Sequence, residues 1–356
     1  GPHQPHFFSA GGGAEGTTFL AEVGIIFLLF LLGLEFSFGR LTRTGRYMTR
    51  AGPVDLLINA GLGVAVGIAV FGVSMAAAIL AGAIYVSSSA LTVKGLIDFK
   101  RLADDETDLI LAILVFEDLA IAVFLGFSAS ETGGILVSIV ALMKAIGYVG
   151  VGIVAARFFA GHLSAFLSRL DAELLLLFSM AILIGMSAIA HAMGMSEAIG
   201  ALMAGVLLAD TPIREQLESR MLSLRDLFAA LFFFVFGLSI DVTAIDSVGW
   251  LLALAVAATL VGKIATGFAS AAVTGFSPRR GLNTGAALVA HGEFTIILAD
   301  IASRNKSIPE DVRTQIVAFA GLYVLATATL GLVVMKQSKW MGRRFIRPRS
   351  HAQGPS

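Results

Sequence analysis

The stretch ILVFEDLAIAVF, residues 113–124, is an apolar run that carries two adjacent carboxylates, Glu117 and Asp118. Continuous apolar runs of about 20 residues, the length that a helix needs to cross a bilayer, recur along the 356-residue chain. The chain is 57% hydrophobic and 14% charged, whereas soluble domains are about 25% charged. Because the runs do not alternate between apolar and polar residues, the sequence predicts an all-α, polytopic membrane protein rather than a membrane barrel.

We predict one membrane domain, residues 17–335, between an extracytoplasmic loop at 1–16 and a basic cytoplasmic tail at 336–356. It contains eleven predicted transmembrane helices, at approximately 17–39, 53–72, 74–96, 107–127, 133–157, 171–192, 195–210, 224–240, 248–275, 282–302 and 313–335. Most Lys and Arg residues of the predicted loops fall on the side of the C-terminus, and Arg304, Lys306 and Arg313 fall on the other. Such a bias predicts a cytoplasmic C-terminus.

The paired carboxylates are the first candidate site. An ionised group at mid-membrane costs about 2.5–3.5 kcal/mol on insertion scales, so acids at that depth usually have a function. Burial and a like-charged neighbour both favour the protonated form of a carboxylic acid, while a bound cation favours the ionised form. One acid can therefore hold a proton or a cation in turn. We assign the cation to Asp118 and leave Glu117 as a second ligand or as the partner of a basic group, and a buried salt bridge without transport is the alternative.

Two other spans have sequences that could interrupt a helix. AIYVSSSALTVKG, residues 83–95, offers the hydroxyls of Ser87, Ser88, Ser89 and Thr92 to the local backbone. A broken helix exposes carbonyls that can bind ions, although small residues also serve helix packing. GAALVAHGEFTIILAD, residues 285–300, carries Gly292 between two titratable groups. Glu293 is expected to compensate helix ends or pair with a base, and its neighbour His291 either titrates or packs.

One lysine, Lys263, lies midway in the ninth predicted span, LLALAVAATLVGKIATGFASAA. An ammonium group at that depth is expected to pair with a carboxylate, and we name Asp118, Glu117 and Glu293 as the available partners. No second His follows His291 with the spacing of a zinc peptidase, and the chain has no Cys, so we expect no transition-metal site.

Taken together, these motifs resemble the monovalent cation:proton antiporters of the Kef/NapA-like branch of the sodium/hydrogen exchanger superfamily. The similar segments follow the family's order: LAEVGIIFLLFLLGLEFSFGRL (20–41), VSSSALTVKGL (86–96), LAILVFEDLAIA (111–122), GMSEAIGALMAGVLLAD (194–210), LFAALFFFVFGLSIDV (227–242), VGKIATGF (261–268) and AHGEFTIIL (290–298). Each segment is weak alone, and their common order and spacing make the set specific.

The resemblance implies a fold of inverted repeats in which the third and tenth spans are broken and cross each other. Core helices, about 53–127 and 248–335, would move against gate and dimer helices, about 17–39 and 171–240, and the protein would form a homodimer. Complete members have thirteen helices, and Gly1-Pro2 matches the end of the family's second helix. The first two helices of the family would then precede residue 1, unless Gly1-Pro2 is the remnant of a tag.

The resemblance also implies a function, secondary active exchange of K⁺ or Na⁺ for H⁺ across a prokaryotic inner membrane, as in pH homeostasis. Asp118 would bind the cation with help from Glu117, Ser88 and Ser89, while Lys263 and Glu293 would balance charge. Family members often have Gln or Asp at the position of Glu117, so the choice of ion and the stoichiometry stay open.

Several other classes are weighed against this function. A gated cation channel could use the same polar spans and is the alternative; an intramembrane hydrolase lacks a nucleophile–base pair in this sequence. We therefore expect no enzyme activity, no cofactor and no nucleic-acid partner. A nucleotide-sensing regulatory domain, frequent in Kef-type members, has no Gly-rich fingerprint after residue 335, so it would be a separate chain or missing.

Overall fold

The structure is a computed structural model that describes four continuous stretches, residues 38–128, 169–193, 197–209 and 245–346. Scattered residues between 23 and 34, 143 and 167, and 211 and 234 are described as well. Every long element in the four stretches is a helix. They are α2 (Phe38–Asp55), η2 (Leu56–Ala60), α3 (Gly61–Phe71), α4 (Met75–Tyr85), α5 (Ser89–Asp98), α6 (Thr107–Ser128), α8 (Ala172–Ala192), α9 (Glu197–Ala209), α11 (Ile245–Thr274), α12 (Pro278–Ala287), α13 (Glu293–Arg304) and α14 (Glu310–Phe345).

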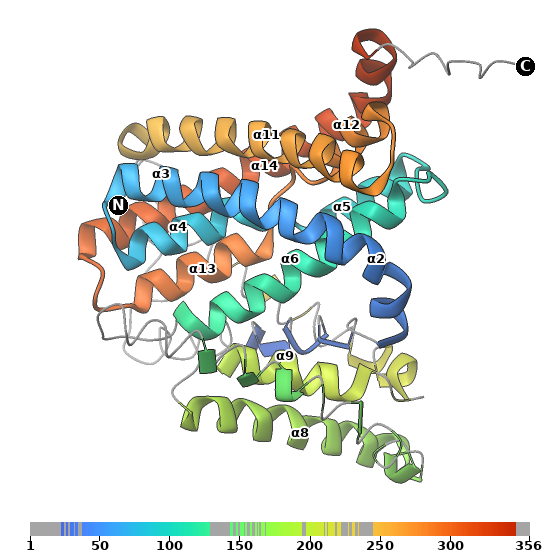
Figure 1. Ribbon diagram of the computed structural model, residues 1–356. Helices are drawn as coiled ribbons and strands as arrows, with labels where there is room; N and C mark the ends of the chain where they lie inside the picture. The colour runs from blue at the N-terminus through green and yellow to red at the C-terminus, as the bar shows by residue number, and fades with distance from the viewer. Residues whose placement is uncertain are drawn as a thin grey trace, which may run out of the picture.

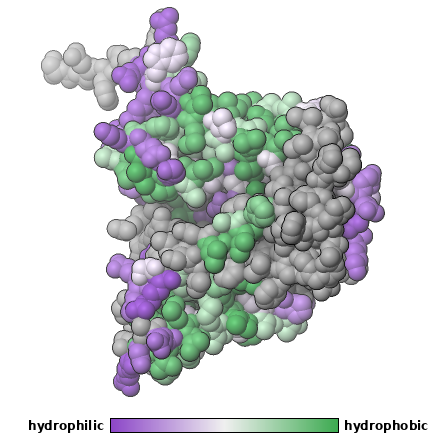
Figure 2. Space-filling model, turned by 180° about the vertical axis from the view of Figure 1, so that it is seen from behind, coloured by the Kyte–Doolittle hydropathy of each residue, from purple (hydrophilic) through white to green (hydrophobic). Residues whose placement is uncertain are grey.

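The described helices fit a polytopic membrane protein. Five helical segments among the described residues are long and apolar enough to cross a bilayer, namely Gly45–Phe71, Met75–Asp98, Glu173–Ala192, Val248–Thr274 and Glu310–Phe345. On the coloured part of the face in Figure 2, hydrophilic residues gather at two opposite ends and hydrophobic residues lie between them. The predicted spans 17–39, 133–157 and 224–240 lie mostly outside the described residues, so the count of eleven stays a prediction.

Two predicted boundaries differ from the structure. The second predicted span was placed at 53–72, but the helix runs without a gap from Phe38 through η2 to Phe71. Pro53, which lacks the N–H for a helical hydrogen bond, is accommodated inside the helix three residues before the five-residue π-helical segment η2. At the other end, α14 continues through its basic residues to Phe345, so the beginning of the predicted tail is helical.

The helices at the two ends of the described chain follow the same order. In the first unit, residues 38–128, a long helix (α2 to α3) precedes an interrupted helix (α4 and α5) and then α6. In the second unit, residues 245–346, α11 precedes the interrupted α12 and α13 and then α14. Each long helix ends at a glycine with positive φ, Gly72 at 64° and Gly275 at 84°, in a three-residue connection that finishes with a serine N-cap. Glycine tolerates this backbone conformation without a steric penalty. This likeness supports the predicted repeat, whose inverted relation stays a prediction.

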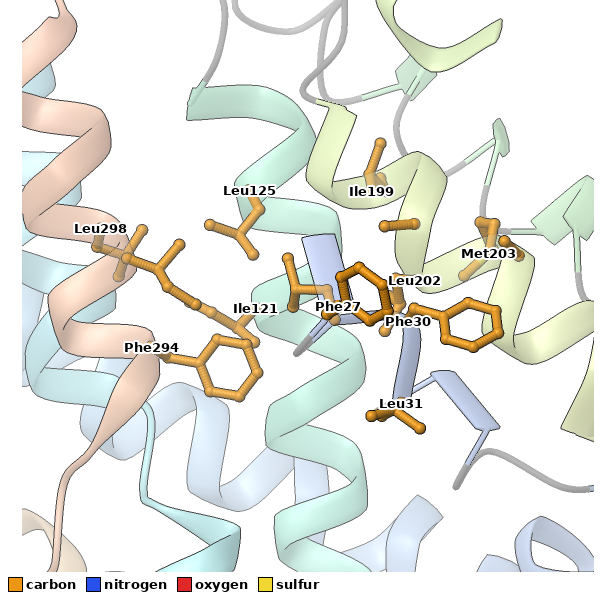
Figure 3. Close-up of a cluster of buried hydrophobic side chains, with 14 of the residues drawn as sticks. Phe27, Phe30, Leu31, Ile121, Leu125, Ile199, Leu202, Met203, Phe294 and Leu298 are labelled. Carbon is orange, nitrogen blue, oxygen red and sulfur yellow. The ribbon is translucent and has the colours of Figure 1, made fainter. Parts of the chain in front are cut away.

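Helix α6 lies between the layer that contains α4 and α13 and the pair α8 and α9 (Figure 1). A buried apolar cluster joins these elements, as Figure 3 shows: Ile121 and Leu125 of α6 lie between Phe294 of α13 and Leu202 of α9. The backbone of α9 also approaches the residues before α2 closely, since a Cβ at Gly205 would lie 2.0 Å from the carbonyl oxygen of Phe30. Small residues permit such contact between membrane helices. The other, polar face of α6 therefore faces the two interrupted helices.

Candidate functional site

The two interrupted helices cross at their breaks. The first break, residues 86–88, separates α4 from α5, and the second break, residues 288–292, separates α12 from α13. The Ser88 N–H donates to the Ala290 carbonyl at 2.7 Å, and the Ser87 hydroxyl donates to the Leu288 carbonyl at 2.8 Å. The Thr92 hydroxyl reaches the Ala287 carbonyl at 2.9 Å. Groups of the first break and of the first turn of α5 therefore satisfy carbonyls at the end of α12 and in the second break.

The second break and the first turn of α13 in turn contact carbonyls at the end of α4. Thr295 donates its hydroxyl to the Ala83 carbonyl at 3.3 Å. The buried imidazole of His291 lies 3.0 Å from the Ile84 carbonyl and 2.9 Å from the Val289 carbonyl, one at each ring nitrogen. At Gly292 a Cβ would lie 2.5 Å from the Ser88 hydroxyl, so a side chain there would push the breaks apart. The two breaks form one hydrogen-bonded unit, which we call the crossing.

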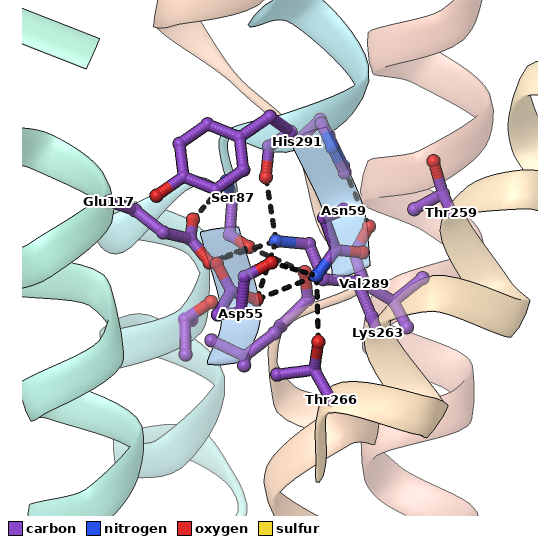
Figure 4. A network of polar contacts seen from close by, with 12 residues as sticks. Asp55, Asn59, Ser87, Glu117, Thr259, Lys263, Thr266, Val289 and His291 are labelled. Atoms are coloured by element: carbon purple, nitrogen blue, oxygen red, sulfur yellow. Dashed lines mark hydrogen bonds and ion pairs between the residues drawn. The ribbon is translucent and has the colours of Figure 1, made fainter. Parts of the chain in front are cut away.

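A buried ion pair lies against the crossing, shown in Figure 4. The ammonium nitrogen of Lys263, from the middle of α11, is 2.8 Å from the Oε1 atom of Glu117, and both side chains are fully buried. The ammonium also donates to the Tyr85 carbonyl at 2.7 Å. Glu117 in turn accepts hydrogen bonds from the backbone N–H and the hydroxyl of Ser87. Among the three partners predicted for Lys263, Glu117 is the one that it contacts.

Asp118, the next residue of α6, points to a different part of the crossing. It is 4% exposed, and its Oδ2 atom accepts a hydrogen bond from the Ser89 hydroxyl at 2.9 Å. Ser88 is the N-cap of α5, and its hydroxyl lies 3.4 Å from Glu293 rather than beside Asp118. The structure thus brings Asp118 together with Ser89, and Ser88 together with Glu293, on the two sides of one turn.

The charges match the helix ends that the breaks create. A helix carries partial positive charge at its N-terminus and partial negative charge at its C-terminus. Lys263 caps the carbonyl of Tyr85, the last residue of α4, while Glu117 accepts from Ser87 just before α5. Glu293 is the first residue of α13. Each charged group therefore lies at a helix end of opposite sign.

One acidic residue of this network was not predicted from the sequence. Asp55 is fully buried at the end of α2, and its Oδ1 atom lies 3.5 Å from the Lys263 ammonium. Asn59 of η2 donates its amide to that same oxygen at 2.7 Å and to the Thr266 hydroxyl of α11 at 2.8 Å. The signal was present, because Asp55 and Asn59 are polar residues four apart in the otherwise apolar DLLINAGLG. The predicted span began at 53, two residues before Asp55, so its position in the sequence did not indicate a buried acid.

Comparison with known proteins shows the family of this chain. The family model described as "Sodium/hydrogen exchanger, transmembrane" matches residues 2–336. The chain belongs to the sodium/hydrogen exchanger family. All the residues of the crossing and of the charged network lie inside the matched range, so the site described above is the polar centre of an exchanger-family membrane domain.

Relatives of this chain are named as antiporters of different cations. The chain is 36% identical to the K⁺/H⁺ antiporter subunit KhtU of Bacillus subtilis, over 95% of this chain and 84% of the relative. It is 29% identical to the ammonium/H⁺ antiporter subunit AmhT of Alkalihalophilus pseudofirmus, over 92% of this chain and 83% of the relative. It is also 29% identical to the high-affinity Na⁺/H⁺ antiporter NhaS3 of Synechocystis, over 82% of this chain and 66% of the relative.

Proposed function

We propose that the chain is a secondary active antiporter that exchanges a monovalent cation, K⁺ or Na⁺, for H⁺ by alternating access. The observation that carries the proposal is a nearly buried carboxylate, Asp118, held by Ser89 at the interruption of a membrane helix. The names of the relatives support the same chemistry, since each is a cation/H⁺ antiporter or a subunit of one.

Asp118 alternates between two occupants in this proposal. Its ionised form binds a dehydrated cation together with the Ser89 hydroxyl and backbone carbonyls near the first break. Its neutral form carries a proton, because an uncompensated carboxylate is costly in an interior that excludes water. Since one carboxyl group cannot hold both occupants together, the cation and the proton compete, and their gradients become coupled.

Glu117 and Lys263 keep the neighbouring helix ends neutral in the same proposal. In this structure Glu117 accepts from Ser87 and Lys263, so it can offer an oxygen to the cation only by loosening its contact with the ammonium. This leaves Asp118 as the acid that exchanges its occupant. Glu293 compensates the N-terminal end of α13 and contacts the N-cap of α5.

The test is exchange by purified protein in proteoliposomes that contain a pH-sensitive dye. A K⁺ or Na⁺ gradient imposed on the wild type should change the internal pH, with a rate that saturates as the cation concentration rises. Asp118→Asn, which keeps the shape but cannot ionise, should reduce that rate to the level of protein-free vesicles. Asp311→Asn, an exposed acid in the first turn of α14, is the matched control and should transport like the wild type.

Two results would contradict the proposal. One is cation-driven pH change that survives in Asp118→Asn at the wild-type rate. The other is a cation flux that ignores the opposing proton gradient and appears as single-channel currents in a planar bilayer, which is the behaviour of a gated channel.

A further inference from the structure

The Lys263 ammonium is surrounded by acceptors on three different helices. A lysine has three N–H donors, and the three acceptors are the Tyr85 carbonyl of α4 at 2.7 Å, Glu117 of α6 at 2.8 Å and Asp55 of α2 at 3.5 Å. Two of these acceptors are carboxylates, so one ammonium is shared by two buried acids. Transport by Asp118 does not by itself explain the second acid.

The two acids differ in how many donors reach them. Glu117 accepts from Lys263, from the Ser87 N–H and from the Ser87 hydroxyl. Asp55 accepts from the Asn59 amide and, at longer distance, from Lys263, both through its Oδ1 atom. Its Oδ2 atom is buried and has no hydrogen-bond partner. Asp55 can therefore accept a further or closer hydrogen bond from the ammonium than it does in this structure.

The position of Asp55 is fixed by the local fold rather than by the ion pair. In the π-helical segment η2, Asn59 donates a hydrogen bond to the Asp55 side chain. Asn59 also donates to the Thr266 hydroxyl of α11. A Cβ at Gly262 would lie 2.4 Å from the Asn59 side-chain oxygen, so the glycine leaves room for Asn59 in this position. Short π-helical segments inside α-helices, also called π-bulges, occur frequently at functional sites. The carboxylate is thus held beside Lys263 even if the ammonium shifts.

We propose that Asp55 is a second counter-ion of Lys263, a positioning residue that keeps the ammonium charged when Glu117 turns an oxygen toward the transported cation. The proposal rests on the proposed antiport function. Other titratable groups face Lys263 as well, namely Tyr85, whose ring centroid is 5.5 Å from the ammonium, and His291 of the second break. Neither is a carboxylate, so neither replaces Asp55 as a counter-ion.

A consequence for stoichiometry follows. If Lys263 stays charged throughout the cycle, it neither releases nor takes up a proton, and Asp118 is the group that changes its occupant. One cation then crosses in one direction for each proton in the other, and no net charge moves. The proposed role of Asp55 therefore predicts electroneutral exchange.

The experiment measures the balance point of the wild type in proteoliposomes with an internal pH dye. A tenfold K⁺ or Na⁺ gradient is imposed, and the external pH is varied until the internal pH no longer moves. One-for-one exchange should balance a tenfold cation gradient with a pH difference of about one unit. A membrane potential set by a thiocyanate gradient should leave that balance point where it is. A balance point that moves with the potential would overturn the inference, and a total lack of cation-driven pH change would instead overturn the antiport function.

Variants of Asp55 then test its part directly. In Asp55→Asn the ammonium keeps one carboxylate, so it loses its proton when Glu117 turns away, and the balance point should become sensitive to the potential. Asp55→Glu should restore the wild-type behaviour, and Asp311→Asn should not depart from it. An Asp55→Asn protein with the wild-type rate and an insensitive balance point would refute the role of Asp55. If Asp55→Asn does not fold, as judged by size-exclusion chromatography, a wild-type balance point that moves with the potential still refutes the role of Asp55.

Discussion

The two breaks satisfy each other's carbonyls, but their surroundings differ. The first break, residues 86–88, meets the consecutive acids Glu117 and Asp118 of α6. The second break, residues 288–292, meets Gly331 of α14, where a Cβ would lie 2.7 Å from the backbone nitrogen of Ala290. One break is surrounded by charge and the other by close backbone packing.

This difference indicates a division of labour between the two units. The first unit supplies Asp55, Glu117 and Asp118, while the second supplies Lys263, Glu293 and the carbonyls to which the first break is hydrogen-bonded. A duplicated arrangement of helices thus carries its consecutive acids in one unit and its buried lysine in the other. The following changes test whether charge, packing and hydrogen bonding are divided in this way.

The largest effect on stability is expected at the charged side. Lys263→Met removes the ammonium and leaves two buried acids without their cation, and breaking a buried pair in this way typically costs about 3–5 kcal/mol. The matched control is Lys94→Met, whose pair with Asp98 is exposed and should be worth about 0–1 kcal/mol. Thermal unfolding in detergent, followed by circular dichroism, measures both. Equal unfolding midpoints for the two variants would show that the buried pair does not stabilise the fold.

The next effect is expected at the packed side. Gly331→Ala places a methyl group within 2.9 Å of the Ala290 backbone and side chain, and such overpacking usually costs about 1–3 kcal/mol. Gly249→Ala in α11 is the control, because a Cβ there meets no atom within 4 Å. The same unfolding assay should separate them, with Gly249→Ala equal to the wild type or slightly more stable. A stable Gly331→Ala protein would mean that the second break tolerates displacement.

A smaller effect should distinguish the hydrogen bonds that the two units exchange. Thr92→Val removes the 2.9 Å hydrogen bond from α5 to the end of α12. Thr295→Val removes the 3.3 Å hydrogen bond from α13 to the end of α4. Side-chain hydrogen bonds between membrane helices contribute about 0.6 kcal/mol on average and up to about 1.7 kcal/mol. Thr92→Val should fall in the upper part of that range and Thr295→Val in the lower part, measured by unfolding in SDS. The reverse order would contradict the longer distance as a guide to strength.

The last effect is expected in ion binding rather than in stability. Ser89→Ala removes the hydroxyl that donates to Asp118, and loss of one such bond, worth about 0.5–1.5 kcal/mol, corresponds to a change of about 2- to 10-fold in an equilibrium constant. The cation concentration for half-maximal exchange should rise by that factor in the proteoliposome assay. Ser179→Ala, which loses only a bond within α8, is the control and should leave it unchanged. An unaltered half-maximal concentration in Ser89→Ala would remove Ser89 from the proposed ion site.

Much of this arrangement was readable from the sequence because membrane burial makes polar residues conspicuous. Glu117, Asp118 and Lys263 stand out in apolar runs, and the contact between Glu117 and Lys263 is among the pairings expected from their charges. The serine run at 87–89 and the Gly292 region both fall at interruptions of helices. Charged residues are costly in lipid, so their presence in an apolar run indicated the site.

What the sequence did not reveal depends on contacts between distant segments. Asp55 follows Arg50 and Pro53, which are typical of a membrane boundary, so its burial against α11 was not apparent from local pattern. The orientation of Ser88 toward Glu293, and of Ser89 toward Asp118, is decided by the φ and ψ angles at the first break. Hydropathy carries no information about those angles.

The Ser88 N–H bond to Ala290 joins the backbones of the two units directly, rather than through side chains that can rotate away. Separating the breaks would expose several carbonyls and an amide to an interior without water, so the crossing has to travel as one rigid body. In a deuterium-exchange experiment, the Ser88 amide should be among the slowest in the chain to acquire label, however readily the surrounding helices slide.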